Sequence, residues 1–339
     1  MTARGRKRNL IVLAVAILVV AIVLSSFIYI NSQKPDASKI DTVTIGLLPN
    51  ESSALIYIAD NQHYFGDNGL NIVFKSYNSG GTAMQGVLNG EVNIAQVSEY
   101  VLVNAALTNA SVSTFGSVSK GESVYLVGRK DLGINSVADL NGKTVGLTFG
   151  TSGEFYFGRF LALNGIDLKN VTEVSVPFAQ SPSALANGTV DAVVTLQQYL
   201  NTIQSQLGNN AISWSVQSNQ PYYSDQVCMN SWAASHPDLI VRFLKATIQA
   251  QNYAISNQKN AMAIVANRLN YTSSYIDTVW PHFQFSVTLD QSQILAMQDE
   301  ARWSISNNYT SATTLPNFIN YIYTNGLESV KPDAVNIIG

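Results

Sequence analysis

Residues 77–99 read YNSGGTAMQGVLNGEVNIAQVSE, and the other elements of the chain are arranged around this run. A strand leads into a turn of small residues, Ser79 to Thr82, where backbone N–H groups can approach a bound group. A short helix then stops at Asn89-Gly90, and a buried apolar strand ends at Ser98-Glu99, where a second helix begins. The pattern predicts two helix N-termini aimed at one crevice, which favours anionic or strongly accepting ligands. The alternative is an ordinary βαβ turn capped by Ser and Thr.

The composition is that of a folded protein with well-filled cores. Of 339 residues, 46% are hydrophobic and 12% are charged, which suffices for two domains of ordinary size. Without the four cations among the first eight residues, 15 basic residues stand against 22 acidic ones, so we expect no nucleic-acid partner. The single cysteine, Cys228, excludes disulfides within the chain and cysteine-based zinc sites. We expect neither a metal nor a cofactor.

The N-terminal region predicts a membrane anchor. Leu10 to Ile30 is an uncharged run of 21 residues, long enough to cross a bilayer as a helix, and it follows four cations. The positive charges predict that the N-terminus stays inside and that the folded part lies outside the cell membrane. We therefore expect an anchor at residues 1–30 and a tether at residues 31–40. A cleaved signal peptide is the alternative.

Strands and helices alternate after the tether. Strand Thr42 to Leu48, a helix from Ala54 to about Tyr64, and the apolar run at residues 70–74 give βαβ order and hence parallel pairing. The strand Ser123 to Gly128 is the expected crossing into a second lobe. The predicted fold class is α/β with two lobes. The first lobe is predicted at residues 41–125 and 223–339, and the second lobe at residues 126–222.

The second lobe repeats the arrangement of apolar strand, small polar turn and helix. One strand ends at Gly150-Thr151-Ser152, a second at Pro177 to Gln180, and a third at Gln197-Gln198-Tyr199. Ligands of open parallel sheets lie beyond the carboxyl ends of the strands, so the turns of both lobes should form the binding site. The predicted ligand-binding residues are Asn50, Glu51, Ser79, Gly80, Gly81, Thr82, Ser98, Glu99, Thr151, Ser152, Gln180, Gln197 and Tyr199.

The C-terminal part is predicted to be helical. Thr288 with Gln291 forms a capping-box pattern for a helix that runs through Trp303. Pro316 to Thr324 is expected to be the last helix, ended by Asn325-Gly326.

Charge around the turns restricts the solute. The turns contain no Arg or Lys, whereas Glu51, Glu99 and Glu154 stand next to them. A like-charge contact at about 4 Å costs roughly 4 kcal/mol at an effective dielectric constant of 20. The solute is therefore expected to be zwitterionic or a neutral heterocycle, with its donor end on a glutamate. In the alternative, all three glutamates point to solvent from the first turns of their helices.

The order of these motifs resembles the solute-binding proteins of nitrate-, sulfonate- and taurine-type ABC importers. The resemblance covers about Thr42 to Ser256 and is carried by Ile45-Gly46-Leu47-Leu48-Pro49, Gly80-Gly81, Leu88-Asn89-Gly90-Glu91-Val92, Asp139-Leu140-Asn141-Gly142-Lys143, Gly150-Thr151-Ser152 and Ala184-Leu185-Ala186-Asn187-Gly188-Thr189-Val190-Asp191-Ala192. It implies a periplasmic-binding-protein type II fold whose lobes close on a small solute, a monomer, and ABC permease and ATPase subunits as partners. Leu196, Gln197 and Gln198 stand where many members have a tryptophan, an acid and a proline.

Other functions remain open from the residues alone. The solute could be sulfonate-, nitrate- or taurine-like, or a pyrimidine precursor. A receptor that senses a ligand without transport would look the same, and a hydrolase would need Glu51, Glu99 and Glu154 to converge in the cleft. Gly142-Lys143-Thr144 is not a phosphate loop, because Val137 stands where that loop needs glycine. We therefore expect a binding protein and not an enzyme.

Overall fold

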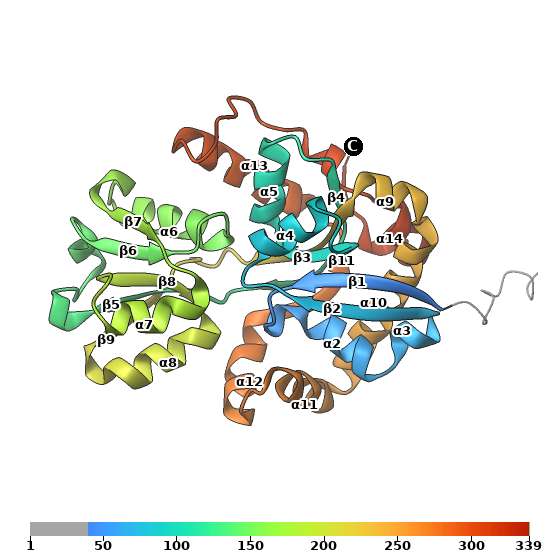
Figure 1. Cartoon of the computed structure of the whole chain (residues 1–339), viewed down its shortest axis with the longest axis horizontal. Coiled ribbons are helices and arrows are strands. Elements are labelled where there is room, and N and C mark those ends of the chain that lie inside the picture. Colours follow the sequence, from blue (N-terminus) through green and yellow to red (C-terminus); the bar gives the residue numbers. More distant parts are fainter. Residues whose placement is uncertain (1–39, 339) are drawn as a thin grey trace, which may run out of the picture. The chain divides into compact units, whose positions relative to one another are not determined.

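The computed structural model of the chain describes residues 40–338, so the predicted anchor and the tether up to residue 39 lie outside the described residues. From Thr42 onward the chain forms one compact unit that contains two sheets (Figure 1). Among residues 40–338, no helix combines the length and the apolar character needed to cross a bilayer.

The first lobe is built on a mixed sheet with the strand order β11-β4-β10-β3-β1-β2. Its strands are β1 (Asp41–Leu47), β2 (Leu70–Ser76), β3 (Ile94–Ser98), β4 (Val112–Gly121), β10 (Tyr222–Met229) and β11 (Phe283–Thr288). β1 and β3 are parallel, whereas β10 runs antiparallel to both β3 and β4. The sheet therefore joins segments that are more than 200 residues apart in the sequence.

The second lobe is built on a sheet with the order β7-β6-β8-β5-β9. Its strands are β5 (Val124–Arg129), β6 (Thr144–Leu147), β7 (Thr172–Ser175), β8 (Ala192–Leu196) and β9 (Ala211–Ser215). β6 pairs in parallel with β7 and β8, as the βαβ order predicts, and β5 pairs antiparallel with β8 and β9. The helices of this lobe are α6 (Ser152–Leu163), α7 (Ser181–Ala186) and α8 (Gln197–Leu207).

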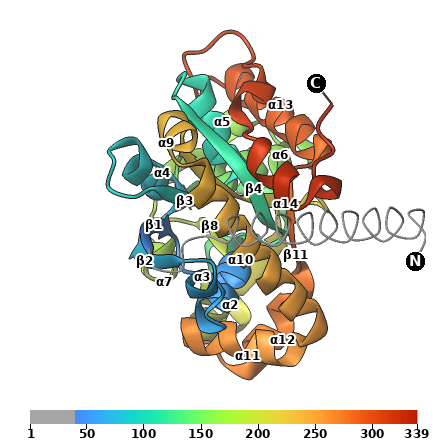
Figure 2. The ribbon, with the colours of Figure 1, turned by 90° about the vertical axis from the view of Figure 1, so that its right-hand side faces the viewer.

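Helices cover the sheet of the first lobe, and their apolar residues belong to two buried clusters, the larger of which also includes residues of the second lobe. They are α2 (Ala54–Asn61), α3 (Tyr64–Asp67), α4 (Gly80–Leu88), α5 (Glu99–Leu107), α9 (Asn230–Ser235), α10 (Pro237–Ser256), α11 (Gln258–Leu269), α12 (Ser273–Val279), α13 (Gln291–Ser306) and α14 (Asn325–Val330). Figure 2 shows α10 between α2 and α14, with α11 and α12 following it. The long C-terminal helices thus complete the core that β1 and α2 begin.

Two chain crossings connect the lobes, and one glutamine joins them. The first crossing lies between β4 and β5, and the second lies between β9 and β10. Gln217 on the second crossing is fully buried, and its Oε1 accepts hydrogen bonds from the backbone N–H groups of Ser123 (2.7 Å) and Val124 (2.9 Å). Its Nε2 donates to the carbonyl of Gly121 at 3.1 Å. The two crossings are therefore tied to each other at the junction of the lobes.

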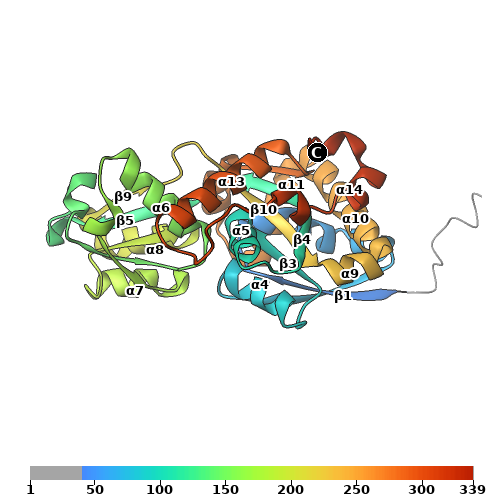
Figure 3. The same ribbon diagram turned by 90° about the horizontal axis from the view of Figure 1, so that it is seen from above.

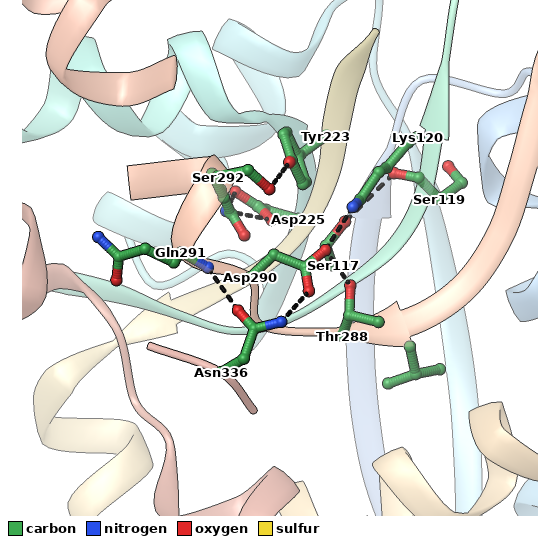
Figure 4. A network of polar contacts seen from close by, with 12 residues as sticks. Ser117, Ser119, Lys120, Tyr223, Asp225, Thr288, Asp290, Gln291, Ser292 and Asn336 are labelled. Carbon is green, nitrogen blue, oxygen red and sulfur yellow. Dashed lines mark hydrogen bonds and ion pairs between the residues drawn. The ribbon is translucent and has the colours of Figure 1, made fainter. Parts of the chain in front are cut away.

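A polar network fixes the start of α13 against the sheet of the first lobe (Figure 4). Lys120 on β4 forms an ion pair with Asp290, and Asp290 accepts a hydrogen bond from Asn336 Nδ2 at 3.1 Å. Tyr223 Oη lies 2.7 Å from Ser292 Oγ. Figure 3 shows α13 extending from this region toward α6 of the second lobe, which it contacts.

Three of the predicted helix boundaries are wrong. The helix from Ala54 is interrupted, because His63 adopts a left-handed conformation (φ 59°) between α2 and α3. Thr288 is the last residue of β11 and pairs with β4, so Asp290 and not Thr288 precedes α13. Asn325-Gly326 begins α14 and does not end a helix at Thr324, where a short 3-10 turn (Phe318–Tyr321) stands instead.

Candidate functional site

A small cavity lies between the two lobes, at the carboxyl ends of the strands. Its volume is about 60 Å³. The first lobe contributes the segments after β1 and β2, the end of β3 with the start of α5, and the start of β10. The second lobe contributes the segments after β6 and β7 and the end of β8. The lining residues are Leu48, Asn50, Ser52, Gly80, Gln96, Val97, Ser98, Val101, Thr151, Ser152, Phe178, Leu196, Tyr222 and Ser224.

The first-lobe turns are held in place by their own hydrogen bonds. Asn50 Oδ1 accepts from the backbone N–H of Ser52 at 3.1 Å and from the Ser52 hydroxyl at 2.6 Å. Ser79 and Thr82 form a capping box at the start of α4: Ser79 Oγ accepts from Thr82 N–H, and Thr82 Oγ1 accepts from Ser79 N–H, both at 3.1 Å. These side chains shape the turns, and Gly80 is the residue of this turn that lines the cavity.

Two serine hydroxyls, one from each lobe, face the cavity without a partner. Ser98 precedes α5 in the first lobe, and Ser152 is the first residue of α6 in the second. Both line the cavity, and neither side chain makes a hydrogen bond within residues 40–338. The neighbouring Thr151 donates its hydroxyl to the carbonyl of Thr148 at 2.7 Å. A bound acceptor would therefore find free hydroxyl donors on both sides of the interface.

The predicted site residues divide into three groups. Asn50, Gly80, Ser98, Thr151 and Ser152 line the cavity. Tyr199 lies in an adjoining groove, described below. Of the others, Gln180 is exposed on the second lobe, Thr82 is exposed, and Glu51, Ser79, Gly81, Glu99 and Gln197 lie outside the cavity lining.

The sequence did not single out four polar residues that line the cavity: Ser52, Gln96, Tyr222 and Ser224. Gln96 on β3 donates through Nε2 to Ser224 Oγ (2.8 Å) and Ser52 Oγ (3.2 Å). Its Oε1 is buried and has no hydrogen-bond partner among the described residues. An amide within the apolar run Ile94-Ala95-Gln96-Val97 was the signal that could have identified it, because a buried polar side chain needs partners.

The three glutamates next to the turns are buried and do not reach the cavity. Glu51, Glu99 and Glu154 are 2%, 0% and 4% exposed, so the alternative that they point to solvent is wrong. Glu154 Oε2 accepts from Tyr100 Oη (3.0 Å) and from the backbone N–H of Gly150 (3.3 Å). Glu99 Oε2 accepts from the backbone N–H of Tyr223 (2.9 Å), and Glu51 Oε2 lies 3.1 Å from Tyr271 Oη.

Burial changes the charge of these carboxyl groups. Desolvation raises the pKa of Glu154 to about 7, against the hydrogen bonds from Tyr100 and Gly150 that lower it. Desolvation also raises the pKa of Glu51, and burial together with the nearby Asp225 raises that of Glu99. A raised pKa reduces the negative charge that a carboxyl group carries at a given pH, and none of the three side chains lines the cavity. The argument against an anionic solute, which assumed three full negative charges, therefore loses its basis.

The cavity lining itself is uncharged. Among the described residues, the side chains around it include hydroxyls, amides and apolar groups but no Asp, Glu, Lys, Arg or His. The starts of α4, α5 and α6 all border it, and helix starts carry a partial positive charge. Such a site holds a compact acceptor group through dipoles and hydrogen bonds and not through ion pairs.

Known proteins share this architecture. The taurine-binding periplasmic protein of Escherichia coli (strain K12) is 24% identical over 219 residues, which are 63% of this chain and 67% of that protein. The alkanesulfonate-binding protein SsuA from Xanthomonas axonopodis pv. citri, solved bound to MOPS, superposes with a TM-score of 0.74 at 15% identity, covering 85% of this chain and 99% of that one. The desulfurization enzyme DSZB superposes with a TM-score of 0.59 at 15% identity, covering 85% and 98%.

These structural similarities show that the chain has the two-lobed α/β fold of periplasmic binding proteins. Both binding proteins and an enzyme adopt this fold, so the fold alone does not determine the function. Family membership is shown by the sequence. The family described as "NMT1/THI5 like" matches residues 50–261, well over half of the chain. The chain belongs to the NMT1/THI5-like family.

Proposed function

We propose that the protein is an extracytoplasmic solute-binding protein that delivers a small polar solute to an ABC importer. The observation that carries the proposal is the uncharged cavity between the lobes, with an unpartnered hydroxyl from each lobe, Ser98 and Ser152, at a helix start. These groups suit a head group that bears several acceptor oxygens, such as a sulfonate or nitrate. The taurine- and alkanesulfonate-binding relatives support the same class of solute.

The position of the cavity between the lobes supports binding by lobe closure. Residues 41–121 with 222–338 would form one rigid lobe and residues 124–215 the other, with the crossings beside Gln217 as the hinge. Because both lobes contribute donors, the solute is fully coordinated only when they approach each other. The cleft must open to admit it.

Membrane attachment through Leu10 to Ile30 is the second part of the proposal, and the uncharged run of 21 residues supports it. The full-length chain expressed in cells is expected to stay in the membrane fraction after an alkaline carbonate wash. Recovery of a shortened chain in the released fraction would instead support a cleaved signal peptide.

Solute binding and closure can be measured together on the full-length chain in detergent. Cys228 is buried, and burial raises the pKa of its thiol to about 12, so cysteines introduced at the exposed positions Gln85→Cys and Ser183→Cys can be labelled selectively. Saturation with methanesulfonate, taurine, nitrate or an aminopyrimidine is expected to change the energy transfer between the two lobes. Binding without any change would contradict the closure mechanism.

Two variants test the hydroxyl donors. Ser98→Ala and Ser152→Ala are each expected to weaken binding by about 0.5–1.5 kcal/mol, because each removes one donor to the solute. Ser273→Ala is the matched control, since Ser273 is likewise the first residue of a helix, α12, but lies outside the cavity lining. Wild-type affinity in both cavity variants, with the fold intact, would remove these helix starts from the site.

A hydrolytic function has less support. It would need carboxylates in the cleft, whereas the carboxyl groups of Glu51, Glu99 and Glu154 are buried outside the cavity lining. A receptor that binds without transport would have the same site, and association of the full-length chain with a permease is the measurement that separates the two.

A further inference from the structure

The cavity between the lobes has room for only part of an ordinary solute. Its volume of about 60 Å³ is well below the roughly 300–1,000 Å³ that ligand pockets usually measure. It can enclose a compact group of a few heavy atoms. The rest of any larger solute must leave the cavity on a side where the lobes do not touch.

A groove of about 480 Å³ adjoins the cavity and provides this space. Leu48 lines both, so the groove and the cavity are neighbours at this residue. Both lobes form it: Tyr77 and Tyr271 come from the first lobe, and Ala179 and Tyr199 from the second. Three tyrosine side chains therefore frame the exit from the cavity.

We propose that the solute carries a flat, uncharged body next to its oxygen-rich head, and that this body lies in the groove between Tyr77, Tyr199 and Tyr271. The proposal rests on the proposed function, which places the head in the cavity. Aromatic side chains bury large flat surfaces and prefer offset or edge-to-face contacts with other rings. An aromatic or heteroaromatic ring attached to a sulfonate has the required chemistry.

The charges around the groove argue against a zwitterion. Among residues 40–338, the side chains that line the cavity and the groove include no Asp, Glu, Lys, Arg or His. The two carboxyl groups next to these tyrosines already have partners within the protein. Glu51 is buried and lies against Tyr271. Glu91 accepts a hydrogen bond from Tyr77 Oη at 3.1 Å and forms an ion pair with Lys75. A primary ammonium group would lose water in the groove without gaining a carboxylate.

Two of the three tyrosines are fixed before any solute binds. Tyr77 packs so closely on α4 that a Cβ atom added to Gly86 would lie 2.2 Å from its Oη. Tyr271 Oη lies 2.8 Å from Gln198 Oε1 of the second lobe, and its ring centroid is 4.4 Å from that of Tyr275. Tyr199 on α8 is half-buried and makes no comparable ring contact within the described part of the chain. A substitution of Tyr199 therefore changes the groove and disturbs the packing of Tyr77 and Tyr271 least.

The test compares three sulfonates by calorimetry on the full-length chain. Benzenesulfonate is expected to bind about tenfold tighter than methanesulfonate, because only its ring reaches the groove, and also tighter than taurine, whose ammonium group finds no partner. Tyr199→Ala should remove the advantage of benzenesulfonate and leave methanesulfonate unchanged, while Tyr199→Phe should retain it. Tyr253→Ala on α10, outside both linings, is the control.

The outcomes separate the two proposals. If methanesulfonate and benzenesulfonate bind equally well and Tyr199→Ala affects neither, the groove does not recognise the body of the solute, while the cavity keeps its role. If taurine binds tightest, the body is charged and the inference is wrong. If none of the three sulfonates binds but nitrate or an aminopyrimidine does, this inference is wrong and the proposed function stands; if none of these ligands binds, both proposals fail.

Discussion

The free energy of unfolding is expected to fall by about 3 kcal/mol or more between pH 5 and pH 8. Glu154 contributes about 2.5 kcal/mol of this decrease, because its pKa rises from 4.5 to about 7 on folding and each unit is worth about 1.36 kcal/mol. Below pH 4.5 the carboxyl group is protonated in both states. Between 4.5 and about 7 only the unfolded chain loses the proton, so the contribution of Glu154 to stability declines over this interval and is constant above it.

Other carboxyl groups act in the same direction. Asp225 (Figure 4) is fully buried on β10 and accepts two hydrogen bonds from Gln293 Nε2, at 2.8 and 2.7 Å. Desolvation raises its pKa to about 8. Glu99 and Glu300 are fully buried beside it, and burial with mutual repulsion raises both pKa values. Neither carboxyl oxygen of Glu300 has a hydrogen-bond partner within residues 40–338. The loss of stability therefore extends to about pH 8.

A matched pair of variants isolates the effect. Glu300→Gln removes a buried group that must hold its proton, so the variant is expected to be more stable than the wild type at pH 8 and to show a shallower pH dependence. Asp299→Asn, the adjacent position on α13, changes the same charge on a side chain that is 64% exposed, and it is expected to change little. Urea denaturation of the full-length chain at several pH values gives the result. Equal slopes for wild type and Glu300→Gln would mean that Glu300 ionises freely in the folded state.

The turns that form the cavity were predictable because their signals are local. A run of apolar residues followed by small polar ones identifies the end of a strand and the start of a helix, and parallel order brings such ends to one edge of a sheet. Asn50, Gly80, Ser98, Thr151 and Ser152 were all found in this way and line the cavity. The resemblance that the order of these motifs indicated is confirmed by the family match over residues 50–261.

The residues that were missed come from long-range pairing. Ser224 reaches the cavity because β10 returns from the second lobe and pairs with β3, with Ser224 opposite Ser98. Nothing in the sequence near Ser224 fixes this register, which depends on the sheet as a whole. The same applies to Tyr222, and to Gln96, whose amide matters only because Ser52 and Ser224 lie next to it.

The glutamates show why a local pattern can mislead about exposure. A glutamate in the first turn of a helix interacts favourably with the helix dipole, and on an isolated helix it would point to water. Here α6 and α13 pack against α5, so Glu99 and Glu154 are covered by elements that the local sequence does not identify. Gly326 is a similar case: a Cβ atom there would lie 2.7 Å from Ile240 Cγ2, so this glycine permits close packing on α10 and does not end a helix.

Gly158→Ala is expected to destabilise the protein by about 1–3 kcal/mol, although Ala normally gains about 1 kcal/mol over Gly inside a helix. Gly158 lies on α6 of the second lobe, and an added Cβ atom would stand 2.3 Å from Cζ2 of Trp303 on α13 of the first. The indole cannot move aside easily. Its ring centroid is 5.6 Å from that of Phe155 and 4.7 Å from that of Tyr309, so rings border it on two sides.

The strain should appear at the contact between the lobes, because relief requires α6 to move away from α13 and so weakens the hydrogen bond from Tyr100 to Glu154. Gly66→Ala on α3 is the control, since this helical glycine has no atom within 4 Å of an added Cβ and its variant is expected to be as stable as the wild type or slightly more stable. Urea denaturation followed by circular dichroism compares the two. A Gly158→Ala variant that matches Gly66→Ala would show that the helices of the two lobes are not in contact at this position in solution.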